Sequence, residues 1–534
     1  MRLLTTVAAL RCYLNKIRSQ SQLKVAEDLI ADEKSSWEQK AVGLVPTMGS
    51  LHQGHLSLIQ RAKQENSTVI VSIFVNPLQF GPNEDYARYP RTLEQDIQLS
   101  EYAGVDAIFA PPPEEMGVPQ KNIQDCLVTQ VIPPSAMISG LCGRSRLGHF
   151  QGVATIVTKL LNLVQPDRAY FGQKDGQQLA IIKRLVADLN LPVEIVACPT
   201  VREASGLACS SRNQYLSGAE KEQAAILYRG LKKAEAAFKS GVRHSSQLIA
   251  VVQQELKTIS NVLVEYIELV EPTTLMSLET IEEEGMLAIA ARLGSTRLID
   301  NTILRDRQPI IAIDGPAGAG KSTVARQVAA ELGLVYLDTG AMYRAITWLV
   351  VQKGIAIEDE CAIAELASTC KIKLTPNQDL KSPVRVWIDD VDVTQDIRTV
   401  EVTSKVSAIA AQSAVRQALV QQQQDWGKKG GLVAEGRDIG SHVFPDAEVK
   451  IFLTASVSER ARRRQQDFQK QGQPEVSLEQ LERDIAERDW KDSTRQVSPL
   501  QKAADALEIQ TDGMSASEVA AQIISYYNQR LSQL

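Results

Sequence analysis

Short apolar runs alternate with stretches of helical periodicity through the first 200 residues. Runs at 41–46, 68–75 and 193–197 have the length and composition of buried strands. Strands that alternate with helices in this way predict a parallel, doubly wound α/β sheet. We therefore expect a Rossmann-like domain over residues 1–215.

The pattern changes after about residue 216. The chain becomes helical and charged, and strand-like segments follow at 263–269, 286–291 and 296–301. This order predicts a smaller α+β domain over residues 216–304. A polar connection at 305–308 then leads into a strand at 310–314 and a helix at 323–332, which open a second α/β domain over residues 309–534.

Composition limits the classes of function. A chain of 534 residues should hold three or four domain-sized units of roughly 100 to 200 residues each. Its 44% hydrophobic and 23% charged residues are typical of a globular protein. The net charge of -6 and the pI of about 5.7 argue against a polymeric nucleic acid as partner, although local basic clusters can still bind small phosphorylated molecules.

Cysteine usage and the apolar segments favour a cytoplasmic protein. The seven cysteines are scattered and form no CxxC pair, which indicates neither a disulfide framework nor a zinc site. The apolar start of the chain is interrupted by Thr5 and Thr6 and lacks the small-residue cleavage site of a signal peptide. No apolar run reaches the roughly 20 residues that a transmembrane helix needs, so no membrane partner is expected.

An HxGH motif at residues 52–55 lies between a predicted strand and a predicted helix. Its glycines permit close approach of backbone to phosphate, and its two histidines can meet the charge on an α-phosphate and a departing pyrophosphate. Taken alone, the histidines could equally cap and pack the turn. Polar segments at 75–80, 172–178 and 206–213 follow other predicted strands, where parallel sheets bind ligands.

With these segments in this order, residues 1–304 resemble pantothenate synthetase, the pantoate-β-alanine ligase of the HxGH nucleotidyltransferase superfamily. The resemblance implies that pantoate attacks ATP to give pantoyl adenylate and pyrophosphate, and that β-alanine then displaces AMP. It implies catalytic roles for His55, His52, Lys174 and Arg212, and contacts of Gln79 and Gln178 with pantoate or β-alanine. The implied ATP-binding residues are Met48, Gly49, Ser50, Leu51, His52, Gln53, Gly54, His55, Gly172, Gln173, Lys174, Asp175, Val201, Cys209, Ser210, Ser211 and Arg212.

Three further features of this half bear on its site. Cys209 stands where the family usually has methionine, and we expect only looser packing near the adenine. Extra polar sequence at 19–40 is expected to form an exposed loop. His149 fits a place near the active site and a packing role equally well.

A phosphate-binding loop of the GxxxxGK[ST] type spans residues 315–322, directly between a predicted strand and a predicted helix. Its backbone N–H groups should cradle phosphates, Lys321 should reach the β- and γ-phosphates, and the Ser322 hydroxyl should face the Mg²⁺ that accompanies ATP. The expected ATP-binding residues are Gly315, Pro316, Ala317, Gly318, Ala319, Gly320, Lys321, Ser322 and Thr323.

Segments at 336–344, 435–438, 459–464 and 487–495 give residues 309–534 a close resemblance to bacterial cytidylate kinase. The resemblance implies transfer of the γ-phosphoryl group of ATP to CMP or dCMP. Arg488 and Arg495 match positions that clamp this group, with Lys491 between them where some relatives have arginine. The arginine run at 460–464 could be a solvated helix face or a nucleotide contact. The implied CMP-binding residues are Asp338, Arg344, Ser407, Arg416, Arg437 and Asp438.

Other functions stay open at this point. The first half could adenylylate a different small carboxylate, and the second half could be a nucleotide sensor without turnover. Because no product of either reaction is a substrate of the other, we expect two independent active sites. The ligase family also implies a homodimer formed through the first half.

Overall fold

A computed structural model describes residues 1–30, 41–81, 84–118, 128–376, 384–470, 476–494 and 499–533. The chain divides into two compact units, Met1–Asp306 and Arg307–Leu534. This boundary falls inside the predicted connection at 305–308, and only residues 306 and 307 separate the last strand of the first unit from the first strand of the second.

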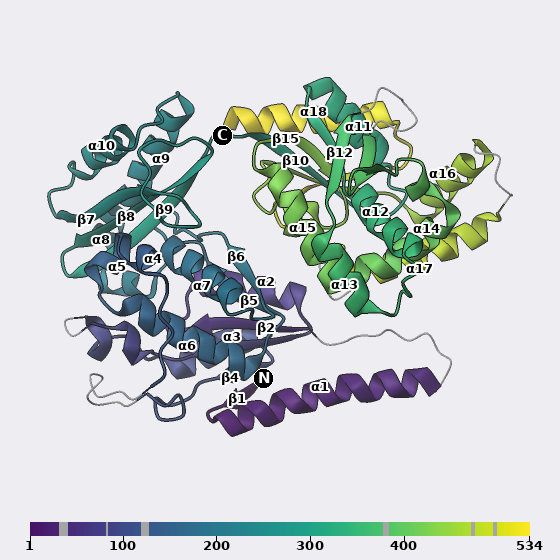
Figure 1. The fold of residues 1–534 in the computed structure, drawn as a ribbon. Coiled ribbons are helices and arrows are strands. Elements are labelled where there is room, and N and C mark those ends of the chain that lie inside the picture. The colour runs from purple at the N-terminus through teal and green to yellow at the C-terminus, as the bar shows by residue number, and fades with distance from the viewer. Residues whose placement is uncertain are drawn as a thin grey trace. The chain divides into compact units, whose positions relative to one another are not determined.

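The first unit is built on a six-stranded, entirely parallel sheet, and this confirms the doubly wound prediction (Figure 1). The strand order reverses at β2, which pairs with β3 on one side and β5 on the other. Ligands bind at such a switch point, outside the carboxyl ends of the strands. In spatial order the strands are β1 (Arg2–Leu4), β4 (Ala107–Phe109), β3 (Thr68–Ile73), β2 (Val42–Thr47), β5 (Arg168–Gly172) and β6 (Glu194–Cys198).

Helices cover both faces of this sheet because successive strand residues point to opposite sides. Leu44 packs with apolar residues of α1, α6 and α7, whereas its neighbour Val45 packs with those of α2. The helical elements before the small domain are α1 (Val7–Ile30), α2 (Gln53–Glu65), η1 (Pro77–Gln79), η2 (Asp85–Ala87), α3 (Leu93–Tyr102), α4 (Ser135–Ile138), α5 (Leu141–Ser145), α6 (His149–Val164), α7 (Gly176–Asp188) and η4 (Ser211–Tyr215).

Two sequence-based expectations fail near the N-terminus. Residues 19–30 continue helix α1, so the expected exposed loop at 19–40 is wrong for that part, while 31–40 lie outside the described residues. Residues 7–30 contain neither glycine nor proline to end the helix. The short strand β1, which adds an edge to the sheet beside β4, was not predicted.

The small domain is an antiparallel sheet of β7 (Val262–Val270), β8 (Glu284–Leu293) and β9 (Thr296–Arg305), with helices α8 (Gly218–Ala224), α9 (Ile226–Lys239) and α10 (Ser245–Leu256). Alternate residues of β8 enter different cores. Leu287 and Ile289 pack with α9 and α10, and Met286 and Ala288 pack with α5 and α7. One face of this sheet therefore rests directly on the larger domain of the first unit.

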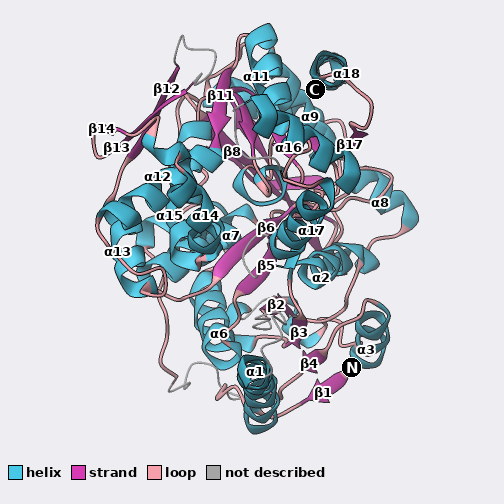
Figure 2. Ribbon diagram, turned by 90° about the vertical axis from the view of Figure 1, so that its right-hand side faces the viewer, coloured by secondary structure: helices cyan, strands magenta, loops and turns pink. Residues whose placement is uncertain are grey.

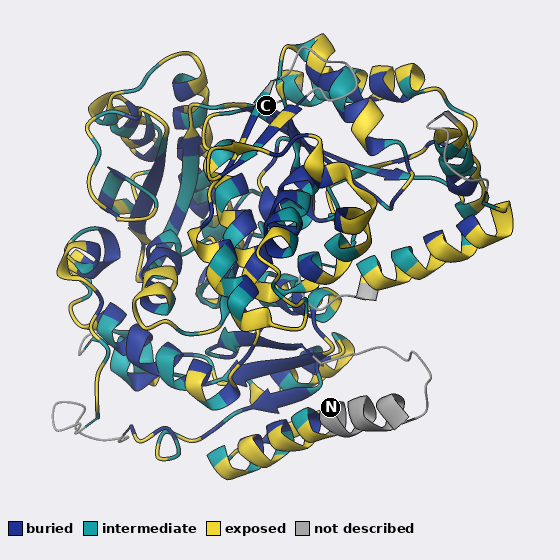
Figure 3. Cartoon of the chain, turned by 45° about the vertical axis from the view of Figure 1, so that its right-hand side comes forward, coloured by how far each residue is buried: buried dark blue, intermediate teal, exposed yellow. Residues whose placement is uncertain are grey.

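The second unit has a five-stranded parallel sheet that carries the phosphate loop at the end of its central strand. The two edge strands of this sheet, β11 and β17, are labelled in Figure 2. Strands of both large sheets are mostly buried, whereas many helices have exposed outer faces (Figure 3). In spatial order the strands are β11 (Val335–Asp338), β15 (Gly430–Glu435), β10 (Gln308–Asp314), β16 (Val449–Thr454) and β17 (Leu507–Gln510), and a separate antiparallel sheet contains β12 (Ile372–Pro376), β13 (Val384–Ile388) and β14 (Val391–Asp392).

The helical elements of the second unit are α11 (Lys321–Leu332), α12 (Thr339–Gln352), α13 (Glu360–Thr369), η5 (Asp396–Arg398), α14 (Val400–Ala411), α15 (Ser413–Gly427), the π-helical turn η6 (Ile439–Val443), α16 (Val457–Lys470), α17 (Leu478–Thr494) and α18 (Ala516–Gln533). Among the described residues, no helix has the length and apolar character needed to cross a membrane.

Candidate functional sites

The HxGH loop leaves the carboxyl end of β2 and opens helix α2, as predicted. Its tight turn is held by Asp96 of α3, whose carboxylate accepts hydrogen bonds from the backbone N–H of Ser50 (2.9 Å) and of Leu51 (2.7 Å). Ser50 adopts a left-handed conformation with φ of 52°. Asp96 is 1% exposed, so its carboxylate fixes the loop from within the protein.

The two histidines of the motif lie against each other, with ring centroids 4.0 Å apart. His52 Nδ1 accepts from Gly54 N at 3.1 Å, and His55 Nδ1 accepts from His52 N at 3.4 Å. Burial is the main cause that lowers the pKa of His52 to about 4 and the pKa of His55 well below its usual range. Both imidazoles are therefore neutral at pH 7, and each carries its proton on Nε2, where it can be donated to a ligand.

Lys174 follows the neighbouring strand β5, across the switch point from the histidines. Its ammonium group donates to the carbonyl oxygen of Cys209 at 3.0 Å. Burial lowers the pKa of Lys174 to about 8, while Asp300 opposes the shift and Arg212 adds to it. Arg212, in η4, forms a two-point ion pair with Asp85, with distances of 2.9 and 2.8 Å.

Gln79 lies in η1 and is held on several sides. Its side-chain N–H donates to Met48 Sδ at 2.7 Å, and its amide oxygen accepts from Asn76 Nδ2 at 3.1 Å. His149 Nδ1 lies 2.7 Å from the backbone oxygen of Gln79, and Arg146 Nη1 lies 2.9 Å from Nε2 of the same ring. Since the carbonyl can only accept and arginine can only donate, His149 is neutral and supports Gln79 from its buried position.

The other predicted ligase residues surround this switch point. Gln173 N donates to Cys198 O, Asp175 caps helix α7 through Gln178 N, and Val201 O accepts from Cys209 N. Ser210 caps η4, and the Ser211 hydroxyl lies 3.2 Å from the hydroxyl of Tyr89. Gly172 ends β5 and Gln178 lies in the first turn of α7. The loop and helix start that follow β2 contain Met48, Gly49, Ser50, Leu51, His52, Gln53, Gly54 and His55.

The phosphate loop joins β10 to α11 and is closely packed. Gly315 has a φ of 145°, and a Cβ there would lie 2.1 Å from the backbone oxygen of Leu453. Only glycine fits this position. Lys321 Nζ donates to the backbone oxygens of Gly315 and Pro316, both at 2.7 Å, and so spans the loop that it helps to form.

Two acidic residues at strand ends complete the loop's surroundings. Ser322 Oγ donates to Glu435 at 2.9 Å, and the hydroxyl of Tyr336 donates to the other carboxylate oxygen at 2.6 Å. Asp314 accepts from the N–H groups of Ile439 and Gly440, both at 2.7 Å, and thereby ties β10 to the turn η6. Burial raises the pKa of Asp314 to about 7.

The predicted acceptor-site residues fall on several elements around this loop. Arg344 donates to Asp338 at 3.1 Å, Arg416 and Asp438 form a buried ion pair, and Arg437 donates to Asp492 at 2.9 Å. Ser407 lies on an exposed part of α14. Arg488 is close enough to Arg437, Arg464 and Arg344 for their charges to lower its pKa, although burial is the larger cause. Arg495 lies outside the described residues.

The arginine run at 460–464 is a solvated helix face only in part, and its contact with a nucleotide stays a prediction. Arg460 is 3% exposed, donates to the backbone oxygen of Ala317 at 3.1 Å and pairs with Asp489. Arg462 instead pairs with Glu459 on an exposed face. Lys491 likewise pairs with Glu487 in solvent, which places its charge in an exposed ion pair.

Sequence reasoning missed several residues that shape these sites. Asp96, Asn76, Asn301, Glu435 and Asp492 all contact predicted site residues or their backbone. Glu435 begins the segment at 435–438, so its proximity could have been inferred. Asn76 lies in the polar segment at 75–80, three residues before Gln79, so its proximity could also have been inferred. Asp96, Asn301 and Asp492 lie far along the chain from the residues that they contact, and no local pattern marks them.

Each half of the chain matches a known protein family. The family model for pantoate-beta-alanine ligase matches residues 17–303, and the model for cytidylate kinase matches residues 311–529. The crystal structure of pantothenate synthetase from Thermus thermophilus is 42% identical, with a TM-score of 0.50, and covers 57% of this chain and 99% of that chain.

Full-length relatives join the same two halves. A bifunctional pantoate ligase/cytidylate kinase from Trichormus variabilis is 84% identical over 533 residues and covers 100% of both chains. Its counterpart from Nostoc sp. is 83% identical over the same length and coverage.

Folds and sites together define an enzyme with two nucleotide-dependent activities, a Rossmann-like ligase followed by a P-loop kinase. The ligase joins pantoate to β-alanine, and the kinase phosphorylates cytidylate. The chain belongs to the bifunctional pantoate ligase/cytidylate kinase family.

Proposed function

We propose that the ligase works through pantoyl adenylate in the site between β2 and β5. The pantoate carboxylate attacks the α-phosphorus of ATP, and the bond to pyrophosphate breaks. The Nε2–H groups of His52 and His55 donate to phosphate oxygens as charge builds there, while Lys174 and Arg212 balance the charge of the polyphosphate. The observation that most supports this proposal is the pair of neutral histidines. Their Nδ1 atoms accept hydrogen bonds from backbone N–H groups, which leaves each Nε2–H group to act as a donor.

The second ligase step needs no covalent bond to the protein. The β-alanine amine attacks the acyl carbon of pantoyl adenylate, the acyl–phosphate bond breaks, and AMP leaves. Gln79 and Gln178 hold the acids without adding charge to the site. Asn76 supports this role, because its side chain donates a hydrogen bond to the amide oxygen of Gln79. The side-chain N–H group of Gln79 is thereby directed toward Met48 in the HxGH loop.

The kinase half is proposed to transfer the γ-phosphoryl group of ATP to a phosphate oxygen of CMP or dCMP, which releases ADP. Arg344 would bind the phosphate of CMP, and Arg488 and Arg495 would neutralise the charge of the transferred group. Arg416, Arg437 and Asp438, with Ser407, would recognise the cytosine and sugar. The hydroxyl of Ser322 and the adjacent Glu435 carboxylate are oxygen ligands of the kind that Mg²⁺ prefers, so these two residues would hold the ion that accompanies ATP, which would help to neutralise the charge of the phosphates.

A homodimer formed through the ligase half and a cytoplasmic location are also proposed. The six cysteines of the described residues are all free, which fits a reducing compartment.

The first test uses the full-length chain with Mg-ATP, pantoate and β-alanine, but without CMP. We expect AMP to accumulate only when both acids are present, with one pantothenate formed per AMP. ADP without AMP would reject adenylate formation, and equal turnover of other hydroxy acids would favour a different carboxylate substrate. With Mg-ATP and CMP but neither acid, the chain should form CDP and ADP. Binding of CMP without formation of CDP would favour a nucleotide sensor.

Lys174 gives the ligase a predicted pH dependence. Its pKa of about 8 means that the ammonium form prevails at pH 7 and loses its proton as the pH rises above 8. Since kcat/KM reports the free enzyme, kcat/KM for ATP should fall above about pH 8, approaching tenfold per pH unit. The decrease of kcat itself should begin at higher pH, because bound phosphates stabilise the ammonium form of Lys174.

The matched variant is Lys174→Arg, because arginine keeps its charge throughout this range. Its activity should be lower, but the alkaline fall in kcat/KM should disappear. A fall that persists unchanged in the variant would show that another group titrates.

A further inference from the structure

The small domain contacts the Lys174 segment through one side chain of β9. Asn301 Nδ2 donates to the backbone oxygen of Gln173 at 2.9 Å and to that of Lys174 at 2.8 Å. Both protons of one amide group are thus directed to two successive carbonyls of the segment. These carbonyls belong to the turn between β5 and α7, outside the hydrogen bonds of either element.

The neighbouring residue on β9 strengthens this connection. Asp300 is 3% exposed and forms a two-point ion pair with Arg202, with distances of 2.6 and 3.0 Å. It also accepts from the backbone N–H of Asn301 at 2.9 Å. Arg202 in turn donates to the backbone oxygen of Gly206, so the same strand is tied to the segment at 206–213.

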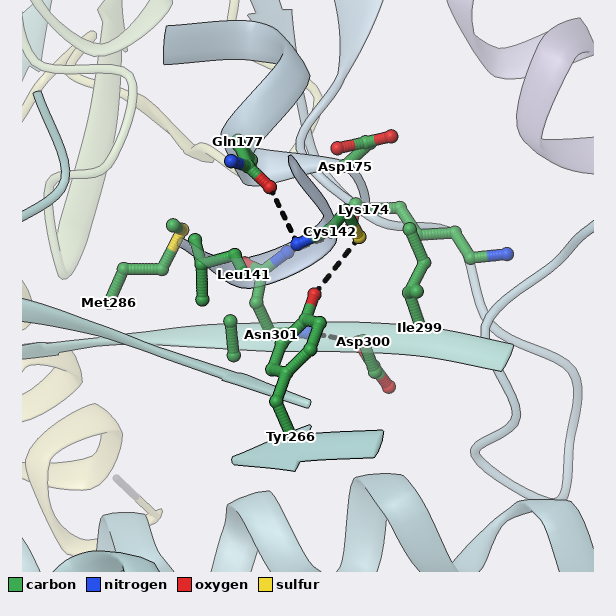
Figure 4. A pocket seen from close by; sticks show the side chains of 12 residues that line it. Leu141, Cys142, Lys174, Asp175, Gln177, Tyr266, Met286, Ile299, Asp300 and Asn301 are labelled. Carbon is green, nitrogen blue, oxygen red and sulfur yellow. Dashed lines mark hydrogen bonds between the residues drawn. The ribbon is translucent and has the colours of Figure 1, made fainter. Parts of the chain in front are cut away.

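The segment after Lys174 also packs closely against the sheet of the small domain. A Cβ on Gly176 would lie 2.4 Å from Met286 Sδ and 3.4 Å from Asn301 Nδ2, so glycine permits the close approach of β8 and β9. Gln177 is fully occupied, because it accepts from Cys142 N and donates to the backbone of Met137. Figure 4 shows Asn301 and Asp300 on the strand that crosses the pocket beside Lys174 and Asp175.

We propose that Asn301 is a positioning residue of the ligase. Its amide holds the backbone of Gln173 and Lys174 in the place from which the lysine ammonium meets the polyphosphate. The proposal rests on the proposed role of Lys174 in ATP binding and adenylate formation. It also gives the small domain a part in the chemistry, since a shift of about 1 Å in a charged group is enough to lower a rate substantially.

The test compares Asn301→Ala, Asn301→Asp and Asn301→Gln in the full-length chain. Thr302→Ala is the matched control on the same strand, because Thr302 makes no side-chain hydrogen bond to any described residue. Kinase activity measures the amount of full-length chain in each preparation, and a thermal unfolding curve of each variant reports whether the ligase half is folded. Ligase kcat and the KM values for ATP and pantoate are then measured for each variant.

We expect Asn301→Ala to lower ligase kcat by about tenfold, with KM for pantoate changed by less than about twofold. Asn301→Asp should lose at least as much, since aspartate has the same shape but no N–H group to donate. Asn301→Gln keeps both donors on a longer arm and should recover part of the loss. Wild-type kcat in Asn301→Asp would overturn the proposal, because only the shape of residue 301 would then matter.

A double variant distinguishes positioning from general loss of structure. If Asn301 acts through Lys174, then Asn301→Ala should cost less than about twofold in a chain that already carries Lys174→Ala, measured under single-turnover conditions. Multiplicative losses would overturn the proposal. Normal activity of Lys174→Ala by itself would reject the proposed role of the lysine, whereas a defective Lys174→Ala beside normal Asn301 variants would reject only the positioning role.

Discussion

Replacement of Lys321 by alanine is expected to lower CDP formation by at least about 10³-fold, while pantothenate formation by the same chain stays within about twofold of wild type. The lysine is the cation at the centre of the phosphate loop, where its ammonium donates to the carbonyls of Gly315 and Pro316. Its loss removes a positive charge from beside the phosphates and takes this donor away from the carbonyls of Gly315 and Pro316.

The measurement is the initial rate of CDP and of pantothenate in parallel assays of one preparation. Lys353→Ala is a suitable control, because this lysine is exposed at the end of α12. Equal loss of both activities would show that the two sites depend on each other. Retention of CDP formation would remove Lys321 from the catalytic machinery.

Replacement of His55 by alanine should have the corresponding effect on the first half. We expect pantothenate formation to fall by about 10³-fold, since an N–H donor aimed at developing charge is removed from an enclosed site. CDP formation should stay within about twofold of wild type. The effect should fall mainly on kcat, because the proposed interaction strengthens as the adenylate forms.

The control is His244→Ala, which changes a histidine of the small domain outside the proposed site. This variant should retain ligase activity. The wild-type profile supplies a second test. Because the pKa of His55 lies well below its usual range, kcat/KM for ATP, which reports the free enzyme, should show no transition near pH 6.5. Such a transition, lost in His55→Ala, would mean that the imidazole cycles through its charged form.

Much of the fold and both nucleotide sites could be predicted because their signals are local. The strand before residue 52, the motif itself and the helix after it are contiguous, and so are the strand, loop and helix around residues 310–332. Backbone geometry at such turns depends on glycines and caps within a few residues. The expected loop at 19–40 failed over residues 19–30 because polar composition alone does not end a helix.

The remaining site residues depend on contacts between distant parts of the chain. Asp96 holds the HxGH loop from 45 residues away, and Asn301 reaches Lys174 across 127 residues. An aspartate or asparagine in such a position has no local pattern that separates it from a surface residue. Only the folded chain shows which carbonyl or N–H group lies opposite.

The sequence by itself determined that this protein has two phosphate-handling sites on two parallel sheets, because glycines, histidines and the phosphate-loop lysine act within single turns. The tertiary structure decided how those turns are held and charged. It buried the two histidines so that both are neutral, placed Asp300 beside Lys174, and brought Glu435 to Ser322. Burial and distance between residues from different elements set these properties, and neither is encoded in any one segment.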